Sequence, residues 1–369
     1  MTPFKQALAN RHETVLKYRQ PGQKVIGWLC SYFPEEIAYA AGMYPVRLMG
    51  GSGETTTADA YLYTNMCSLV RSCLEEGFKG AYSYLDGFVT LNSCDHVRRL
   101  YDVWGPSQKT PYTYIIPLPH AISDASLVYF HHEVRQFKES LEAAFGVTIT
   151  AEALQDAIRV YNKTRTLLGR LNELRKLEEP PITGAEFLEV VLAATTLPRE
   201  VYNKMLEKFV AEVEARPGIP TDEKVRLLLV GSELDDPAYV QMIEDMGGLV
   251  VADDLCTGTK YFWNLAETDG DPLLSLAKRY LTRPECPRMR PARNRLRHLR
   301  ELIVSHQADA VVMEVIKFCN LYGEDYTIVR NFLRKMDVPL LQLSREYNIG
   351  AVGQMRTRVE AFFERIWGA

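Results

Sequence analysis

Four apolar runs in this chain end on or just before a cysteine. They are KVIGWLC (24–30), LDGFVTLNSC (85–94), GLVVADDLC (248–256) and ADAVVMEVIKFC (308–319). Short runs rich in β-branched and aromatic residues, bounded by turn-forming residues, are typical of buried strands. In open α/β sheets, ligands bind in the crevice beyond the carboxyl ends of the strands. The pattern therefore predicts thiols gathered where parallel strands end.

Helical segments separate these runs and further strand-like runs. One helix is predicted after Pro34, ending at Gly42, and another over NMCSLVRSCLEEGF, residues 65–78. Strand-like runs also cover 44–50, 112–119, 224–232 and 338–344, and amphipathic helices are predicted at both ends of the chain. Strands that alternate with helices form mainly parallel sheets covered on both faces. The predicted fold class is α/β, with two doubly wound, flavodoxin- or Rossmann-like domains and a helical middle segment.

The middle of the chain has a different period. From about residue 125 to 216, apolar residues recur at helical spacing with no strand-like run between them. We therefore expect three units: an N-terminal helix with the first α/β domain (1–124), a helical segment (125–220) and a second α/β domain (221–369).

The bulk composition excludes several classes of protein. Of the 369 residues, 47% are hydrophobic and 24% charged, and the net charge is −4. These values are ordinary for a globular protein and favour neither a nucleic-acid partner nor a membrane surface. No run has the ~20 apolar residues of a membrane-spanning helix, and the N-terminal residues lack the apolar centre of a signal peptide. We expect a cytoplasmic protein.

The seven cysteines do not look like a disulfide framework, since their number is odd and they are spread from Cys30 to Cys319. A single free cysteine is most simply a small buried apolar residue; otherwise it is a metal or cluster ligand, or a nucleophile. Thiolates gathered at one crevice suit soft metals and iron–sulfur clusters. No CxxC pair of a zinc ribbon and no nucleotide-binding motif such as GxxxxGK[ST] or GxGxxG is present.

Two of these thiols are expected at the starts of helices. Cys94 precedes a helical segment, and so does Cys67 if Thr64 or Asn65 caps that helix. The positive end of a helix dipole lowers the pKa of a nearby thiol. Cys73 lies six residues beyond Cys67, which is about 120° around the helix, so it need not share the site.

Other polar residues have plainer interpretations. His96, close to Cys94, is a secondary candidate for the site, and His131 and His132 fit a solvated helix face. Asp253 and Asp254 could coordinate magnesium, but acidic pairs before a loop are commonly a helix-entry feature.

Six ordered motifs resemble the 2-hydroxyacyl-CoA dehydratase / benzoyl-CoA reductase family. They are GWLCSYFPEEIAYAAGMYPVRLMG, NMCSLVRS, NSCDHVRRLYD, DDLCTGTKYFW, KFCNLYGEDY and GQMRTRVEAFFE, and the resemblance runs from about residue 5 to the C-terminus. The segment around SLAKRYLTRPECPRM is slightly closer to the smaller catalytic subunit of the benzoyl-CoA reductase type.

This resemblance implies an iron–sulfur catalytic subunit that carries a 4Fe-4S cluster with one open iron. Its cysteine ligands carry over to Cys67, Cys94 and Cys319. A separate iron–sulfur ATPase would act as activator and supply single electrons at low potential. The substrate would be a CoA thioester, and the partner a homologous second subunit in a heterodimer, or a second copy in a homodimer.

Several functions stay open. The leading interpretation is benzoyl-CoA reductase-like ring reduction, and the alternative is elimination of water from a 2-hydroxyacyl-CoA. A related branch of homodimers holds a double-cubane cluster on more cysteines; Cys256, Cys286 and one of Cys30 or Cys73 would make six here. A non-catalytic cluster scaffold or maturation subunit is the remaining possibility.

Overall fold

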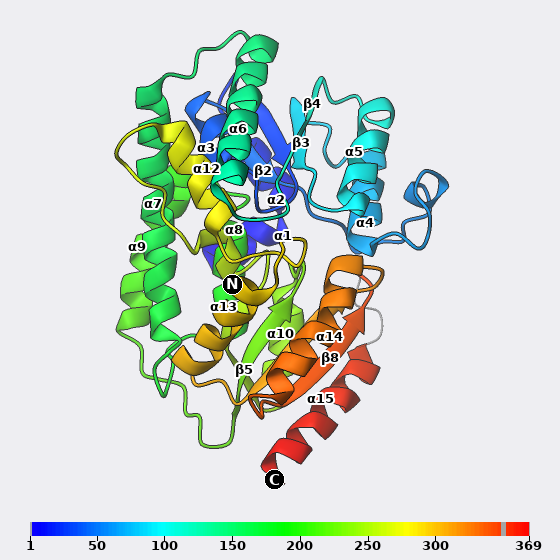
Figure 1. The fold of residues 1–369 in the computed structure, drawn as a ribbon, viewed down its shortest axis with the longest axis vertical. Coiled ribbons are helices and arrows are strands. Elements are labelled where there is room, and N and C mark those ends of the chain that lie inside the picture. The colour runs from blue at the N-terminus through cyan, green and yellow to red at the C-terminus, as the bar shows by residue number, and fades with distance from the viewer. Residues whose placement is uncertain (1, 348–351, 369) are drawn as a thin grey trace.

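The computed structural model describes residues 2–347 and 352–368. It contains two four-stranded sheets, one in each half of the chain (Figure 1). The first sheet consists of β1 (Val25–Trp28), β2 (Tyr44–Arg47), β3 (Gly87–Leu91) and β4 (Tyr112–Ile116). The second consists of β5 (Val225–Gly231), β6 (Gly248–Asp254), β7 (Ala310–Ile316) and β8 (Leu340–Arg345).

Both sheets have the same topology. The strand orders are β2-β1-β3-β4 and β6-β5-β7-β8, and every pairing is parallel. In each sheet the chain starts at an inner strand, moves to one edge, and then crosses to the other side. The order therefore reverses between β1 and β3, and between β5 and β7, and such switch points open ligand crevices at the carboxyl ends of the strands. The predicted α/β class with two mainly parallel sheets is confirmed.

Helices cover the sheets and fill the middle of the chain. In the first part they are α1 (Pro3–Ala9), α2 (Arg11–Tyr18), α3 (Glu35–Ala40), the 3₁₀ turn η1 (Ala58–Ala60), α4 (Ser68–Phe78) and α5 (Asp95–Ser107). In the middle they are α6 (Asp124–Phe145), α7 (Ala151–Leu174), α8 (Gly184–Ala193) and α9 (Arg199–Glu214). In the last part they are α10 (Pro237–Glu244), α11 (Thr259–Phe262), α12 (Pro272–Thr282), α13 (Arg293–Ser305), α14 (Asn320–Arg334) and α15 (Val352–Trp367).

Two helical features differ from the sequence expectation. The N-terminal helix is broken at Asn10, which has φ −117° and ψ 41° and separates α1 from α2. The helix α8 shows no clear one-sided pattern because nearly all of its side chains are buried. A helix that is apolar on most sides gives little periodic signal. It packs against α1 and α10 and contacts β6 of the second sheet.

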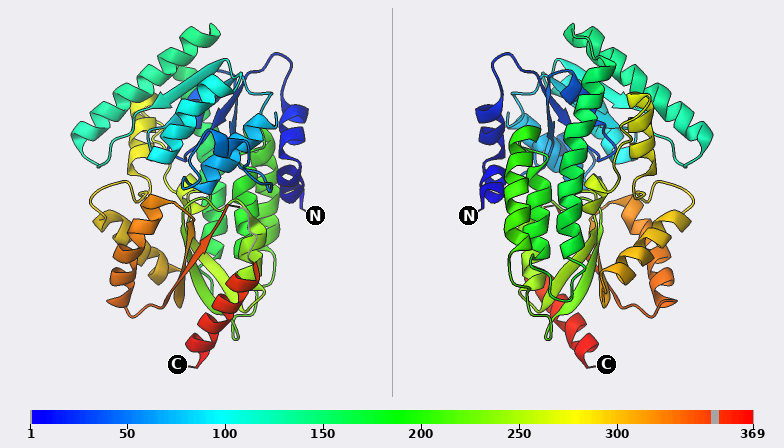
Figure 2. Two further views of the ribbon diagram at one scale, coloured as in Figure 1. Left: turned by 90° about the vertical axis from the view of Figure 1, so that its right-hand side faces the viewer. Right: turned by 90° about the vertical axis from the view of Figure 1, so that its left-hand side faces the viewer.

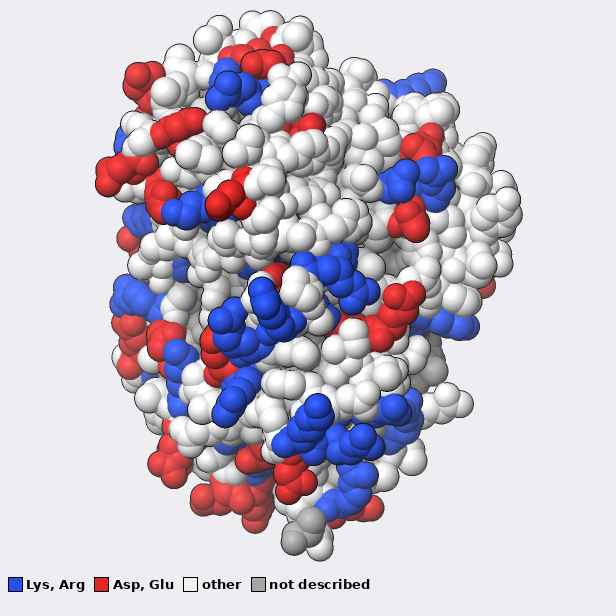
Figure 3. Space-filling model, in the orientation of Figure 1, with Lys and Arg blue, Asp and Glu red and all other residues white. Residues whose placement is uncertain are grey.

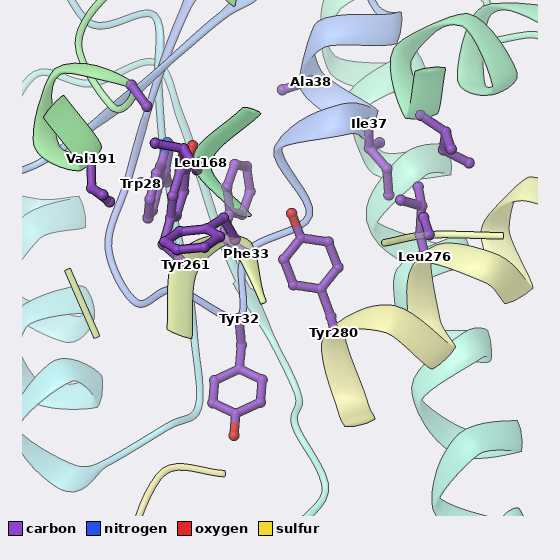
Figure 4. Packing of buried hydrophobic residues seen from close by; sticks show 14 of the residues in the cluster. Trp28, Tyr32, Phe33, Ile37, Ala38, Leu168, Val191, Tyr261, Leu276 and Tyr280 are labelled. Carbon is purple, nitrogen blue, oxygen red and sulfur yellow. The ribbon is translucent and has the colours of Figure 1, made fainter. Parts of the chain in front are cut away.

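The middle helices connect the two halves. The long α7 and α9 pack against each other and run beside both sheets (Figures 1 and 2). The helix α12 packs against α6 and α7, although it lies in the last third of the sequence. In the same core, Tyr261 stacks on Trp28 with ring centroids 6.5 Å apart, and Trp28 stacks on Phe33 at 5.7 Å (Figure 4). The same core therefore contains residues from both halves.

Polar contacts also tie the halves together near the strand ends. Arg47, at the end of β2, forms an ion pair with Glu233, just after β5. The Gly50 N–H donates to the Tyr347 hydroxyl at 2.9 Å, and Arg283 donates to the Ser31 carbonyl. None of the helices in the described ranges combines the length and apolar character needed to cross a bilayer.

Candidate metal centre

A cavity of ≈ 420 Å³ lies between the two halves, at the carboxyl ends of their strands. Six of the seven cysteines line it: Cys30, Cys67, Cys94, Cys256, Cys286 and Cys319. All seven are free thiols. Apolar side chains, including Leu29, Val97 and Ile316, form much of the remaining wall.

The three thiols predicted as ligands share one local geometry. Cys67, Cys94 and Cys319 are the N-cap residues of α4, α5 and α14, so each stands at the positive end of a helix. The Val97 N–H donates to the Cys94 sulfur at 3.5 Å. Cys67 lies at a helix start, as considered from the sequence, but the N-cap of α4 is Cys67 itself and not Thr64 or Asn65.

The other three thiols reach the cavity by different routes. Cys30 follows β1 and has a left-handed backbone with φ 79°, so the chain turns sharply there. Cys256 follows β6, and its N–H donates to the Ser232 carbonyl at 3.2 Å. Cys286 follows α12 rather than a strand, and its N–H donates to the Tyr32 hydroxyl at 3.2 Å. Tyr32 points away from the aromatic rings around Trp28 (Figure 4).

Burial dominates the chemistry of these thiols. It raises the pKa of Cys67 to about 11 and those of Cys94 and Cys286 to about 12. Burial likewise raises the pKa of Cys256 and Cys319 above the ordinary value. Backbone N–H groups at the helix starts pull the other way, for example Leu69 and Val70 at Cys67. The expected lowering of thiol pKa is therefore wrong for Cys67 and Cys94, because the cost of placing a bare thiolate in this cavity exceeds the benefit of the helix end.

Three of the six thiols are helix N-caps and three are not, and the thiols also influence one another. Beyond burial, the pKa of Cys94 is raised by Cys67, and that of Cys319 is raised by both Cys67 and Cys94. The pKa of Cys256 is raised by Cys30, after the larger effects of burial and Glu233.

The pKa of Cys286 is likewise raised by burial and then by Cys256 and Cys30. We call the three N-cap thiols, Cys67, Cys94 and Cys319, the first thiol set, and the other three, Cys30, Cys256 and Cys286, the second thiol set. Such effects on pKa run between the two sets as well, since Cys30 raises the pKa of Cys94 and Cys286 raises that of Cys319.

Cys73 is the one cysteine outside the cavity. It is 0% exposed and packs in an apolar core with Leu74 and Tyr82. Its helix, α4, begins at the cavity, and rotation along the helix carries Cys73 away from it. The structure therefore gives Cys73 the environment of a small buried apolar residue, in line with the helical geometry argued from the sequence.

Several cavity residues lacked a strong sequence signal. His96 lines the cavity, and its Nδ1 accepts the Cys67 N–H at 3.2 Å. Arg288 donates to the Leu118 carbonyl at 2.9 Å, and burial lowers its pKa. Tyr322 lies three residues beyond Cys319, in the first turn of α14, so its place at the cavity could have been inferred once that helix start was fixed.

The acidic pair at the end of β6 lies beside basic side chains. Asp253 pairs with Arg175 at 2.8 Å and accepts the N–H of Thr259, the first residue of α11, at 2.7 Å. Asp254 pairs with Lys260 at 2.8 Å. On α6, His131 lies 3.0 Å from Asp271.

The donor set of the cavity suits a polynuclear cluster. Within residues 2–347 and 352–368, no group of three or more His, Cys, Asp or Glu side chains is gathered tightly enough to hold a single metal ion. A 4Fe-4S cluster instead takes cysteine thiolates spaced around a larger inorganic core. Six thiols around one cavity, in two sets of three, fit such a group, and its positive iron would displace the thiol protons.

Comparison with known proteins places the chain in a family. The family model described as "2-hydroxyglutaryl-CoA dehydratase, D-component" matches residues 30–366. The chain is 30% identical to "Putative dehydratase subunit YjiM" of Escherichia coli, over 98% of this chain and 97% of the relative. It is 27% identical to a benzoyl-CoA reductase subunit of Thauera aromatica, over 95% of this chain and 92% of the relative.

A third relative is the "(R)-phenyllactyl-CoA dehydratase beta subunit" of Clostridium sporogenes, 25% identical over 98% of this chain and 97% of the relative. The matched range contains strands β2 to β8 and the middle helices, and it includes all six cavity cysteines. The chain therefore belongs to the family of 2-hydroxyacyl-CoA dehydratase and benzoyl-CoA reductase subunits.

Proposed function

We propose that this chain is an iron–sulfur redox subunit in which six thiols together hold a cluster larger than a single cubane. The observation that carries the proposal is that six thiols line one cavity between the halves. Three thiolates per set match the ligand number of one cubane with an open iron. The cavity thus supports the double-cubane interpretation over the three-ligand cluster favoured from the sequence. Its sixth thiol would be Cys30, which lines the cavity, rather than Cys73, which does not.

When bound, such a cluster supplies single electrons at low potential. The chain contributes the environment: thiol sulfurs as ligands, three helix N-termini directed at the first thiol set, and an apolar wall that limits water. Arg98, Arg288 and Arg290 also line the cavity. Their positive charge suits the approach of an anionic substrate or partner.

Exposed arginines also lie on α13 and α14, outside the cavity. Arg293, Arg297 and Arg300 on α13, and Arg330 and Arg334 on α14, are exposed. Figure 3 shows basic side chains on the lower part of the face seen in Figure 1. The electrons would come from a separate ATP-dependent iron–sulfur activator in the cytoplasm, as the family resemblance implies, and the chain would work as an oxidoreductase or a lyase.

The second candidate function uses the first thiol set alone. Cys67, Cys94 and Cys319 would hold one 4Fe-4S cluster, and the substrate would be a CoA thioester, either reduced or dehydrated. The names of the relatives favour this candidate, since they are subunits of acyl-CoA dehydratases and of benzoyl-CoA reductase. Those names also favour a homologous partner subunit, whereas the double-cubane branch would pair two copies of this chain.

Iron content after anaerobic reconstitution separates the candidates. Cys286→Ala should lower the iron per chain to about half of the wild-type value, because one thiol set is broken and the other is intact. Cys73→Ala is the matched control and should keep full iron. Full iron in Cys286→Ala, with loss of iron in Cys94→Ala, would instead establish the three-thiol site. Turnover with an ATP-dependent activator then distinguishes an enzyme from a cluster scaffold.

A further inference from the structure

Tyr322 is the side chain that joins the second thiol set to a buried pair of charges. It lies in the first turn of α14, three residues after Cys319, and is 3% exposed. Its hydroxyl is 3.8 Å from the Cys256 sulfur and 3.1 Å from Lys260 Nζ. The hydroxyl is thus placed between a cavity thiol and a cation.

The direction of these hydrogen bonds is fixed by Lys260. Its ammonium group is 0% exposed and lies 2.8 Å from Asp254 Oδ2. An ammonium group can only donate, so the Tyr322 oxygen must accept from Lys260. The single hydroxyl hydrogen of Tyr322 is then left to point at Cys256. Asp254 holds Lys260 in place and balances its charge.

The two thiol sets receive hydrogen bonds of different kinds. In the first thiol set the donors are backbone N–H groups at helix starts, such as Val97 at Cys94 and Leu69 and Val70 at Cys67. At Cys256 the partner is a side chain, the Tyr322 hydroxyl, so a substitution can remove it without changing the backbone. A hydrogen bond to a cysteine sulfur favours added negative charge on a bound iron–sulfur group.

We propose that Tyr322, oriented by Lys260 and Asp254, is a positioning residue that donates to the Cys256 sulfur and makes an iron–sulfur group held there easier to reduce. The inference rests on the proposed six-thiol function. One electron enters from the activator or from a chemical reductant of low potential, and no bond at the thiolates is made or broken.

The test is a redox titration of reconstituted protein, followed by electron paramagnetic resonance, on wild type, Tyr322→Phe and Tyr326→Phe. Tyr326 lies one turn further along α14 and does not line the cavity, so it is the matched control. Tyr322→Phe should make the first reduction harder by about tenfold in its equilibrium constant, a shift of about 59 mV to more negative potential for one electron. Tyr326→Phe should leave the potential unchanged.

A second readout does not depend on reduction. In reconstituted wild type, Cys256 should resist alkylation, because its sulfur is a ligand. An unchanged potential in Tyr322→Phe, with full iron and protected Cys256, overturns the inference while the six-thiol site stands. A loss of iron in Tyr322→Phe also overturns it, since Tyr322 would then be needed for holding the group. Alkylation of Cys256 in reconstituted wild type refutes the six-thiol site, and the inference falls with it.

Discussion

Cys94 and Cys319 occupy matching positions in the two halves of the chain. Each lies three residues beyond the third strand of its sheet, β3 or β7, and each is the N-cap of the following helix. Both belong to the first thiol set. The repeated sheet topology therefore places one thiol from each half at the same cavity, and neither half alone contains a complete set.

This relationship makes Cys319 the critical thiol of the second half for the first thiol set. We expect Cys319→Ser to lose iron from that set and to abolish electron transfer, because serine is a poorer ligand for iron than a thiolate. The fold should persist, since Cys319 is only partly buried. Iron analysis and far-ultraviolet circular dichroism check these expectations. Wild-type iron content together with full activity would remove Cys319 from the ligand set.

Cys73 provides the opposite case. Cys73→Ala should retain both iron content and activity, with a loss of unfolding free energy of roughly 1 kcal/mol for a small truncation in the core. Urea denaturation and iron analysis measure the two effects. If this variant lost about half its iron while remaining folded, Cys73 would belong to the site and the assignment of Cys30 would be wrong.

The buried thiols predict an unusual pH dependence of alkylation in the cluster-free chain. An ordinary thiol has a pKa of about 8.5, so its reaction rate levels off above that pH. The pKa values of about 11 for Cys67 and about 12 for Cys94 mean that their rates should still rise about tenfold per pH unit between pH 8 and 10.

Mass spectrometry after brief iodoacetamide treatment resolves each cysteine. In urea, the same thiols should react faster and level off near pH 9. The raised pKa values also predict how stability depends on pH. The folded chain keeps these thiol protons, whereas the unfolded chain loses them at about pH 8.5. The free energy of unfolding is therefore fully retained below about pH 8.5 and falls as the pH rises toward the pKa values of the folded chain. A plateau below pH 10 in the folded chain would contradict the burial of these thiols.

Asp253 should be important for stability. Its carboxylate pairs with Arg175, whose side chain is 1% exposed, and accepts the Thr259 N–H. Asp253→Ala leaves that guanidinium buried without its partner, so we expect a loss of about 3–5 kcal/mol in unfolding free energy. Glu301→Ala is the control, because the Glu301 side chain is 64% exposed and its removal should change stability by less than about 0.5 kcal/mol. Equal effects of the two substitutions would show that the buried pair contributes little.

The features that could be predicted from the sequence depend on local pattern. The strands, their parallel arrangement and the gathering of strand-end thiols follow from apolar runs and from the rule that crevices form at the carboxyl ends of parallel strands. Cys30, Cys94, Cys256 and Cys319 obey this rule. The place of Cys73 follows from helical rotation, which is equally local.

The features that sequence reasoning missed depend on packing between distant segments. Cys286 follows a helix, and it reaches the cavity only because α12 packs against α6 and α7. The raised thiol pKa values depend on how completely the two halves exclude water, which no spacing reveals. The same holds for Lys260, which looks like a surface residue in the sequence but is buried between Asp254 and Tyr322.

The distribution of the six cavity thiols along the chain sets an order of events during biosynthesis. The first sheet is complete at Ile116, and Cys30, Cys67 and Cys94 have then been synthesised, but Cys319 follows some two hundred residues later. The second thiol set is complete only at Cys286, and the first only once β7 and the start of α14 have been translated. Insertion of a cofactor held on all six thiols therefore follows synthesis of most of the chain, and a nascent chain must protect its early cysteines until the second half closes over them.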